Sequence, residues 1–302
     1  MTDAERMGDL KLALAAAIEA GRAVMRSFGQ DMQVTHKSPE QPLTAADLEA
    51  DRILHQRLLD ARPAYGWLSE ETADHPERLR RDRVWIVDPI DGTRSFIAGR
   101  REFGVSVGLA EKGRAVLGVI LNPATGELYA CWRGGGAWKL EDALAGDPAA
   151  PTPSLPPSPP WRRLAVRPPR AAPVILASRS EIRDGEFEPF AGFELLPLGS
   201  TTYKLARLAE GAGDLFLSRG PKSEWDLCAG GLLVREAGGA ATDLLGAPLV
   251  YNRPDPRIPG ILAAAPALHA EIRRRLAGLP PVARLARQAD DPLHPGLGEQ
   301  ED

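Results

Sequence analysis

The 302-residue sequence predicts an α/β fold in which helices and sheets form layers. Two segments with helical spacing of apolar residues come first, at 9–28 and at 44–62. Short apolar runs separated by turn residues follow between 84 and 131, which favours an antiparallel sheet packed under those helices. Strand-like and helix-like segments then alternate from residue 174 onward.

The two N-terminal helices are separated by a polar stretch. The first is expected over residues 9–28, where leucine and isoleucine side chains share one side. A polar loop is expected at 30–41. The second helix begins at Thr44, because Thr44-x-x-Asp47 ahead of an apolar face is a capping signature, and it ends near Pro63.

The remaining elements are read in the same way, from apolar runs bounded by turn residues. Strands are expected at Val84–Val87, Gly104–Leu109, Ala115–Leu121, Leu128–Cys131, Val174–Ala177 and Leu215–Leu217. Helices are expected at Thr201–Ala209, Asp226–Ala237 and Ala267–Ala277, the second of them ending at a glycine pair that suits a helix C-terminus.

A proline-rich segment interrupts this pattern. Ten prolines lie between Pro148 and Pro173, and apart from Trp161 and Leu164 the segment has few residues of the kind usually buried. Such a composition favours extended polyproline geometry and predicts a surface insertion at a domain junction. A binding site for a proline-recognising partner is the alternative interpretation.

Composition excludes several classes of function. The apolar content of 43% and charged content of 26% are typical of a globular protein. A net charge of −4 predicts no attraction of the whole chain to a nucleic acid polymer or an anionic membrane. The longest apolar stretch, 12–18, is far shorter than the roughly 20 residues of a membrane span. Two cysteines form no disulfide framework, so a cytoplasmic location is expected.

The most informative motif follows the apolar run 84–87. It reads Asp88-Pro-Ile-Asp91-Gly92-Thr93 and places two carboxylates at the end of a buried strand, where a cation is needed to neutralise them. Hard oxygen ligands suit Mg²⁺, and the Gly-Thr pair offers amide groups and a hydroxyl for a phosphate and a water. An ordinary strand-end turn is the alternative, since Asp, Pro and Gly are common turn residues.

Four motifs in order resemble the inositol monophosphatase superfamily of Mg²⁺-dependent phosphomonoesterases. They are Leu43-Thr-Ala-Ala-Asp47, Leu68-Ser-Glu-Glu71, Trp85-Ile-Val-Asp-Pro-Ile-Asp-Gly-Thr93 and Glu224-Trp-Asp226. The resemblance implies an αβαβα sandwich with two sub-domains. It further implies an N-terminal α+β metal-binding domain at 1–142 and a C-terminal α/β substrate domain at 174–279. Composition predicts a proline-rich insertion or linker between them at 143–173 and a disordered tail at 280–302.

The resemblance also assigns roles to individual residues. Glu70, Asp88 and the Ile90 carbonyl would hold one Mg²⁺, and Asp88, Asp91 and Asp226 a second, with a weaker third ion near Glu70. Further expected roles are water orientation by Glu70 and Thr93, polarisation of Thr93 by Asp47, phosphate binding by Gly92, Thr93 and Arg94, and leaving-group contacts by Ser200, Lys204 and Arg219. Asp47 has an alternative role as a helix cap.

The substrate is expected to be a small phosphorylated metabolite. Gly92-Thr-Arg-Ser-Phe-Ile97 and Gly220-Pro221 resemble bacterial 3′(2′),5′-bisphosphate nucleotidases, and Arg219 stands where inositol-selective members usually carry a Glu. Hydrolysis of adenosine 3′,5′-bisphosphate to AMP and phosphate is therefore favoured. The alternatives are an inositol 1-phosphate, sugar phosphate or histidinol phosphate phosphatase, and a catalytically silent phospho-ligand scaffold. The resemblance makes a homodimer plausible.

Overall fold

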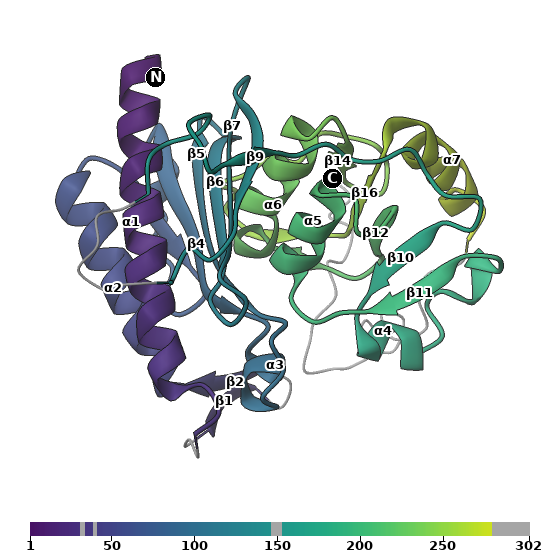
Figure 1. Cartoon of the computed structure of the whole chain (residues 1–302), viewed down its shortest axis with the longest axis horizontal. Helices are drawn as coiled ribbons and strands as arrows, with labels where there is room; N and C mark the ends of the chain where they lie inside the picture. Colours follow the sequence, from purple (N-terminus) through teal and green to yellow (C-terminus); the bar gives the residue numbers. More distant parts are fainter. Residues whose placement is uncertain (31–33, 39–40, 146–152, 280–302) are drawn as a thin grey trace, which may run out of the picture.

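A computed structural model of the chain describes residues 1–30, 34–38, 41–145 and 153–279, and it arranges them in five layers (Figure 1). Across the molecule these layers are helices α1 (Asp3–Ser27) and α2 (Ala45–Ala61), a seven-stranded sheet, helices α5 (Thr201–Ala209) and α6 (Glu224–Glu236), a five-stranded sheet, and helix α7 (Pro266–Leu276). This order confirms the predicted αβαβα sandwich. The expected disordered tail at 280–302 lies outside the described residues.

The N-terminal helices cover one face of the first sheet. Helix α1 spans Asp3–Ser27 and starts earlier than predicted, because Thr2 and Glu5 form a reciprocal capping box. Helix α2 spans Ala45–Ala61 and is capped by Thr44, as predicted. The predicted loop between the helices was wrong in part, since β1 (Val34–Ser38) and β2 (Gln41–Thr44) pair there as an antiparallel hairpin.

The first sheet follows the order of the chain and confirms the four strands expected here. Its strands are β3 (Gly66–Ser69), β4 (Arg83–Asp91), β5 (Gly104–Glu111), β6 (Arg114–Asn122), β7 (Glu127–Trp132), β8 (Gly136–Leu140) and β9 (Arg162–Arg163). Only β3 and β4 pair in parallel; the later pairs are antiparallel.

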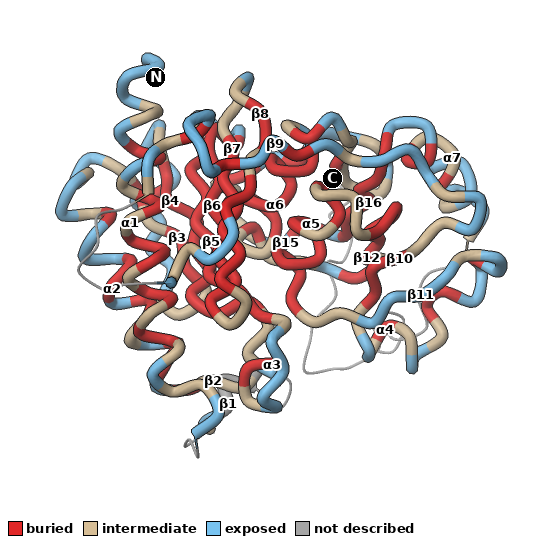
Figure 2. Tube along the Cα trace, in the orientation of Figure 1, coloured by how far each residue is buried: buried red, intermediate tan, exposed pale blue. Residues whose placement is uncertain are grey.

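Strand β4 is apolar throughout because both faces of the sheet are covered. Trp85 and Val87 belong to the core under α1 and α2, whereas Val84 and Ile86 belong to the core under α5 and α6. Side chains alternate across a strand, so a strand between two helical layers must be apolar at every position. Figure 2 shows the resulting band of buried residues through β4–β7, α5 and α6.

The predicted insertion at 143–173 contains a short strand, β9, that the sequence did not predict. Most of residues 153–173 are exposed or half-buried. Trp161 and Leu164 are buried, and Arg163 of β9 pairs with Trp138 of β8 at the edge of the sheet. An edge strand needs hydrogen bonds on one side only, so prolines before it are tolerated. Residues 146–152 lie outside the described part of the chain.

The C-terminal half supplies the middle helices and the second sheet. Helices α5 (Thr201–Ala209) and α6 (Glu224–Glu236) match two predicted helices, and α6 packs so closely on the first sheet that a Cβ on Gly118 would lie 2.8 Å from the Cα of Ala229. Its other elements are β10 (Val174–Ala177), α4 (Arg179–Arg183), the 3₁₀ turn Glu188–Phe190, β11 (Glu194–Pro197), β12 (Leu215–Ser218), β13 (Lys222–Ser223), β14 (Ala240–Thr242), β15 (Arg257–Ile258), β16 (Ile261–Ala264) and α7 (Pro266–Leu276). The N-terminal half also contains the 3₁₀ turn Pro76–Arg80 and the short helix α3 (Thr93–Ile97).

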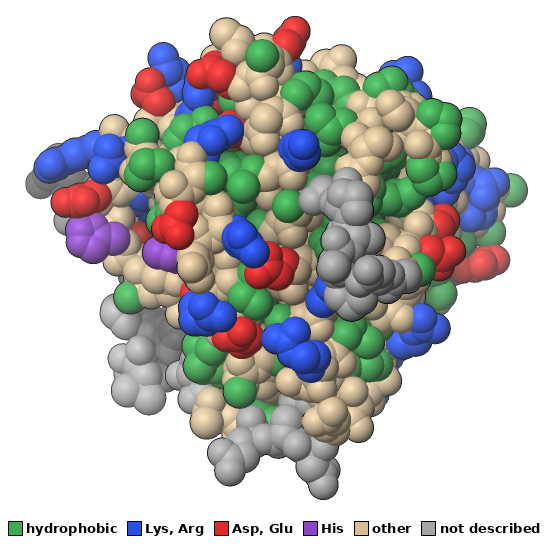
Figure 3. Space-filling view, turned by 60° about the vertical axis from the view of Figure 1, so that its left-hand side comes forward, with side chains coloured by type: hydrophobic (Ala, Val, Ile, Leu, Met, Phe, Trp, Pro, Cys, Tyr) green, Lys and Arg blue, Asp and Glu red, His purple; other side chains and the backbone are tan. Residues whose placement is uncertain are grey.

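The second sheet has the order β11-β10-β12-β16-β14. Strands β10 and β12, which the sequence predicted, lie at its centre, whereas β11, β14 and β16 were not predicted. No helix in the described residues is long and apolar enough to cross a membrane. On the face drawn in Figure 3, Lys and Arg side chains lie among Asp and Glu side chains, and neither charge dominates.

Candidate active site

Three carboxylates from distant parts of the chain meet where β4 ends and α6 begins. Asp88 and Asp91 lie in the last residues of β4, and Asp226 lies in the first turn of α6. One carboxylate oxygen from each lies within 4.8 Å of the others. The structure therefore joins the predicted Asp-Pro-Ile-Asp and Trp-Asp motifs into one acidic cluster.

Asp88 lies at the centre of this cluster and is only 1% exposed. Its Oδ1 accepts a hydrogen bond from the amide of Ile90 at 3.1 Å, whereas its buried Oδ2 has no hydrogen-bond partner within the described residues. Burial, and then the charges of Glu70, Asp91 and Asp226, raise the pKa of Asp88 well above its usual range. A divalent cation satisfies the unpaired oxygen and offsets the repulsion, so these residues fit Mg²⁺.

Asp91 is held by the start of α5. Its Oδ2 accepts hydrogen bonds from the Ser200 hydroxyl at 2.6 Å, from the Thr202 hydroxyl at 2.7 Å and from the Thr202 amide. These donors occupy one carboxylate oxygen and leave Oδ1 for another ligand. Ser200 also caps α5 by accepting from the amide of Tyr203 at 3.0 Å. Sequence reasoning missed Thr202, although a Ser-Thr-Thr run at a helix start indicates capping hydroxyls.

Asp226 is positioned by the first turn of α6. The amide of Ser223 donates to its Oδ2 at 2.9 Å, which is one half of a capping box. The helix therefore begins at Glu224, two residues before the predicted start. Burial and the neighbouring Asp91 raise the pKa of Asp226 to about 7. Trp225, which directly precedes Asp226, lines the adjoining pocket.

Thr93 and Asp47 are brought together as predicted from the motifs. The Thr93 hydroxyl lies 3.2 Å from Oδ1 of Asp47 and 3.0 Å from the carbonyl oxygen of Ile90. The other oxygen of Asp47 accepts from the amide and hydroxyl of Thr44, at 2.8 and 2.6 Å. Asp47 thus caps α2 and contacts Thr93 at the same time, so the two interpretations of this residue are compatible.

Gly92 joins β4 to the short helix α3 in a conformation that glycine favours. Its φ of 95° is left-handed, and a Cβ at this position would lie 2.9 Å from the carbonyl oxygen of Glu102 and 3.1 Å from the Cβ of Ser200. Any larger residue would meet both backbone strain and a clash. The turn that presents Thr93 therefore depends on glycine.

An open pocket of about 670 Å³ extends from the acidic cluster towards the second sheet. Glu70, Asp91, Thr93 and Asp226 line one end. The basic residues that line it are Arg94, Arg100, Arg179, Arg183, Lys204 and Lys222. Of the leaving-group residues expected from the sequence, Ser200 and Lys204 line this pocket. Arg219 does not, and its charge interacts with that of Glu186.

Lys204 is the buried member of this basic group. It is 2% exposed, and its ammonium lies 5.2 Å from the centre of the Phe216 ring. Burial lowers the pKa of Lys204 to about 8 despite the attraction of Glu181. Burial by itself would raise the pKa of the Glu181 carboxyl. The charges of Lys204 and Lys222 and hydrogen bonds from Ser178 outweigh this effect and lower that pKa to about 2.

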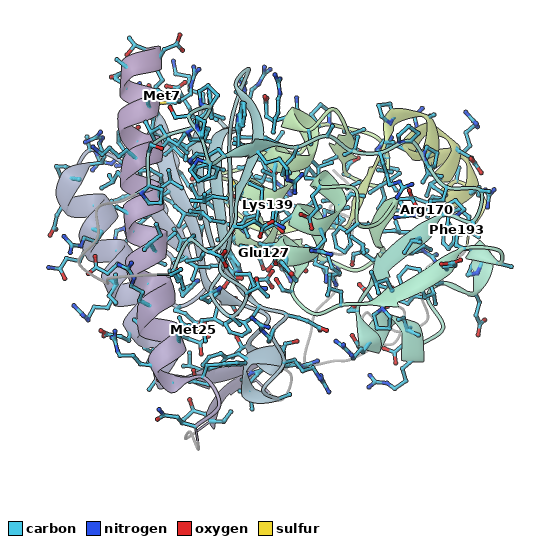
Figure 4. The ribbon with its side chains drawn as sticks, in the orientation of Figure 1. Met7, Met25, Glu127, Lys139, Arg170 and Phe193 are labelled. Carbon is cyan, nitrogen blue, oxygen red and sulfur yellow. The ribbon has the colours of Figure 1, made fainter. Side chains whose placement is uncertain are left out.

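A buried ion cluster anchors α5 to the first sheet. The ammonium of Lys139 lies 2.6 Å from Glu127 and 2.8 Å from Glu210, and the Tyr203 hydroxyl donates to Glu127 at 2.6 Å. Figure 4 shows Lys139 and Glu127 between the sheet and α5. Because α5 also carries Ser200 and Lys204, this cluster fixes the helix that shapes one wall of the pocket.

Comparison with known proteins relates this geometry to one group of enzymes. Residues 8–278 match the inositol monophosphatase family. The inositol-1-monophosphatase of Rhizobium meliloti (strain 1021) is 37% identical over 250 residues, covering 78% of this chain and 86% of that protein. The 3′(2′),5′-bisphosphate nucleotidase CysQ of Escherichia coli (strain K12) is 31% identical over 243 residues, covering 78% and 91%.

The fold is also found among solved structures. The extragenic suppressor protein suhB from Bartonella henselae superimposes with a TM-score of 0.72 at 29% identity. The match covers 90% of this chain and 99% of that protein. The similarity therefore extends across both sheets and is not confined to the acidic motif.

Proposed function

This chain belongs to the inositol monophosphatase family of phosphomonoester hydrolases, and we propose that it is an Mg²⁺-dependent phosphatase whose substrate carries a second phosphate, with adenosine 3′,5′-bisphosphate favoured. Members of the family act on small phosphorylated molecules and are generally Mg²⁺-dependent. The group of Lys and Arg side chains that lines the pocket with the acidic cluster is the observation on which the substrate proposal depends.

The acidic end supplies ligands for two ions, or three. Glu70, Asp88 and the Ile90 carbonyl would hold the first, and Asp88, Asp91 and Asp226 the second, while a third would rely on Glu70. When bound, Mg²⁺ supplies Lewis acidity for water activation and positive charge for the phosphate. The unpaired oxygen of Asp88 supports its role as the residue shared by two ions.

The protein groups around the reacting phosphate have separate roles in this proposal. The hydroxyl hydrogen of Thr93 is directed to Asp47 and the Ile90 carbonyl, so the oxygen of Thr93 can accept a hydrogen from the attacking water. Glu70 lines the same end of the pocket and would orient that water from the other side. The amides of Gly92 and Thr93 would bind phosphate oxygens, where the absence of a side chain on Gly92 allows close approach.

The leaving-group end favours an anion. Arg94, Arg183 and Lys222 line the pocket together with the buried Lys204 and with Arg179, which also pairs with Glu102. An uncharged polyol needs no such group of cations, whereas a second phosphate on the leaving group binds Arg and Lys through charge-assisted hydrogen bonds. In this proposal AMP leaves from that end after transfer of the other phosphate to water.

Inositol 1-phosphate is the second candidate substrate. The inositol-1-monophosphatase relative is more similar to this chain than the nucleotidase, at 37% against 31% identity over nearly equal lengths. Both substrates would use the same acidic cluster, so only the leaving-group end distinguishes them. Histidinol phosphate tests the same end of the pocket with a cationic leaving group, whereas the leaving group of adenosine 3′,5′-bisphosphate is an anion.

Phosphate release decides between these candidates. Adenosine 3′,5′-bisphosphate, inositol 1-phosphate and histidinol phosphate are compared at saturating Mg²⁺ and again with excess chelator. The proposal expects a kcat/KM at least tenfold higher for the nucleotide, and loss of all release with chelator. Equal kcat/KM values, or a preference for inositol 1-phosphate, would refute the nucleotide assignment, and chelator-resistant release would refute Mg²⁺ dependence.

A further inference from the structure

Helix α2 presents a second carboxylate to the interior of the protein. Asp51 lies one helical turn after Asp47 and therefore on the same side of the helix. It is buried, at 9% exposure, and no motif of the sequence assigns it a role. A buried carboxylate is unfavourable unless polar partners satisfy it, so its partners indicate what it does.

Both oxygens of Asp51 are used. Oδ1 accepts from the Ser69 hydroxyl at 2.5 Å, and Oδ2 accepts from the Thr72 hydroxyl at 2.6 Å. Ser69 is the last residue of β3, and Thr72 follows three positions later. The two contacts therefore bracket Glu70 and Glu71 and hold both ends of the turn that carries them.

Neighbouring donors fix the direction of these hydrogen bonds. The Ser69 hydroxyl accepts from the amide of Glu71 at 3.4 Å, and the Thr72 hydroxyl accepts from the indole nitrogen of Trp67 at 3.3 Å. Each hydroxyl thus accepts on one side and donates to Asp51 on the other. Position 51 therefore needs a side chain with two hydrogen-bond acceptors. Aspartate provides two, whereas asparagine has one acceptor oxygen and an amino group that can only donate.

The same turn is attached to the acidic cluster. The amide of Glu70 donates to the carbonyl of Val87 at 3.3 Å, and Val87 immediately precedes Asp88 in β4. The charge of Glu70 acts on Asp88, and Glu70 lines the pocket. The backbone beside Glu70 is therefore held by β4 on one side and by Asp51 of α2 on the other.

We propose that Asp51 is a positioning residue that sets the direction of the Glu70 carboxylate for cation binding, through Ser69 and Thr72. The inference rests on the proposed Mg²⁺ site. Residues behind a ligand that orient it change metal affinity without touching the ion, typically by roughly 10- to 100-fold. Loss of Asp51 should accordingly weaken Mg²⁺ binding more than it impairs the enzyme once Mg²⁺ is saturating.

Calorimetric titration of the full chain with Mg²⁺, without substrate, tests this directly. Asp51→Asn keeps the size of the side chain, and Asp60→Asn removes the same charge from an exposed position on the same helix. The expected result is a rise of about tenfold or more in the Kd for Mg²⁺ in Asp51→Asn and no change in Asp60→Asn. The Mg²⁺ concentration for half-maximal turnover should rise in parallel, with kcat recovering within about threefold at saturating Mg²⁺.

Two milder variants make the test independent of folding. Ser69→Ala and Thr72→Val each remove one hydroxyl, and each should raise the Kd less than Asp51→Asn does. Adding either change to Asp51→Asn should have little further effect, because the hydroxyls act through the carboxylate. If Asp51→Asn does not fold, these two variants decide the question through the same titration.

The outcomes separate the two proposals. A folded Asp51→Asn protein that binds Mg²⁺ within twofold of the unchanged chain overturns the positioning role, as do unchanged Kd values in both hydroxyl variants. A lower melting temperature with an unchanged Kd assigns Asp51 to stability alone, which also overturns it. Absence of Mg²⁺ binding by the unchanged chain would refute the proposed metal site itself.

Discussion

Replacing Asp88 by Asn should affect stability in opposite directions without and with Mg²⁺. The substitution keeps the shape of the side chain and removes one negative charge from a cluster whose oxygens lie within 4.8 Å of one another. Two like charges at that separation repel by roughly 3 kcal/mol at an effective dielectric constant of about 20. Part of this repulsion is already relieved in the metal-free protein, because the raised pKa of Asp88 favours its protonated form.

The metal-free variant should therefore be more stable than the unchanged chain by on the order of 2 kcal/mol, or about 4 °C in Tm for a chain of this size. Mg²⁺ at about 100 times its Kd should stabilise the unchanged chain by roughly 2.7 kcal/mol. The variant lacks the carboxylate proposed to bridge two ions and should gain little. Its turnover should fall on the order of a thousandfold or more.

Thermal melts with chelator and with Mg²⁺, together with phosphate release, check this prediction. Asp60→Asn serves as the control, since it removes a charge from an exposed position and should behave like the unchanged chain in every assay. The reasoning is refuted if the folded variant retains near-normal turnover. It is also refuted if Mg²⁺ raises the Tm of the variant as much as that of the unchanged chain.

Three further predictions concern the pocket and its supports. Lys204→Met should stabilise the protein below pH 8 by up to about 3 kcal/mol, because the pKa falls from 10.5 unfolded to about 8 folded. Chemical denaturation should show that this gain in unfolding free energy shrinks between pH 8 and 10.5. Phosphate-release assays should show that the variant loses its preference for a bisphosphate. A gain that stays constant with pH would contradict a buried charge on Lys204. Gly92→Ala should lower the free energy of unfolding by at least 2 kcal/mol and remove most of the activity. Gly99 is the control, because its φ is also left-handed, at 67°, but an added Cβ would meet no atom within 4 Å. Gly99→Ala should cost about 1 kcal/mol of stability and retain activity, which thermal melts and kinetics can check. Lys139→Met should destabilise the fold by about 3 kcal/mol in denaturant titrations, because it leaves Glu127 buried with weaker pairing; a change under 1 kcal/mol would argue against the cluster.

Several elements could be predicted because their signals are local. Thr44 with Asp47 marks the start of α2, since a capping box involves neighbouring residues only. The apolar run before Asp88 predicts a strand because it is covered on both faces. The start of α1 carries a similar local signal, the capping box of Thr2 and Glu5, which precedes the apolar pattern that predicted the helix from residue 9.

Other features depend on partners far away in the chain. Strand β9 forms at Arg162–Arg163 because an edge of the first sheet is available there, not because the proline-rich sequence favours it. Strand β16 is a run of four apolar residues that becomes a strand between β12 and β14. Strand preference depends on such neighbours more than helix preference does, so these elements were missed.

The sequence by itself determined the layered α/β class and the helix starts with capping signals, because these depend on residue type and short spacing. The candidate metal ligands followed from the resemblance of four motifs to a known family. The tertiary structure alone decided which groups meet. It brings Asp226 to Asp88 through the packing of α6, directs Ser200 and Thr202 to Asp91, buries Lys204 beneath the pocket and leaves Arg219 outside the pocket lining. These relations join residues more than a hundred positions apart, and they follow from how helices and sheets pack, which no local pattern encodes.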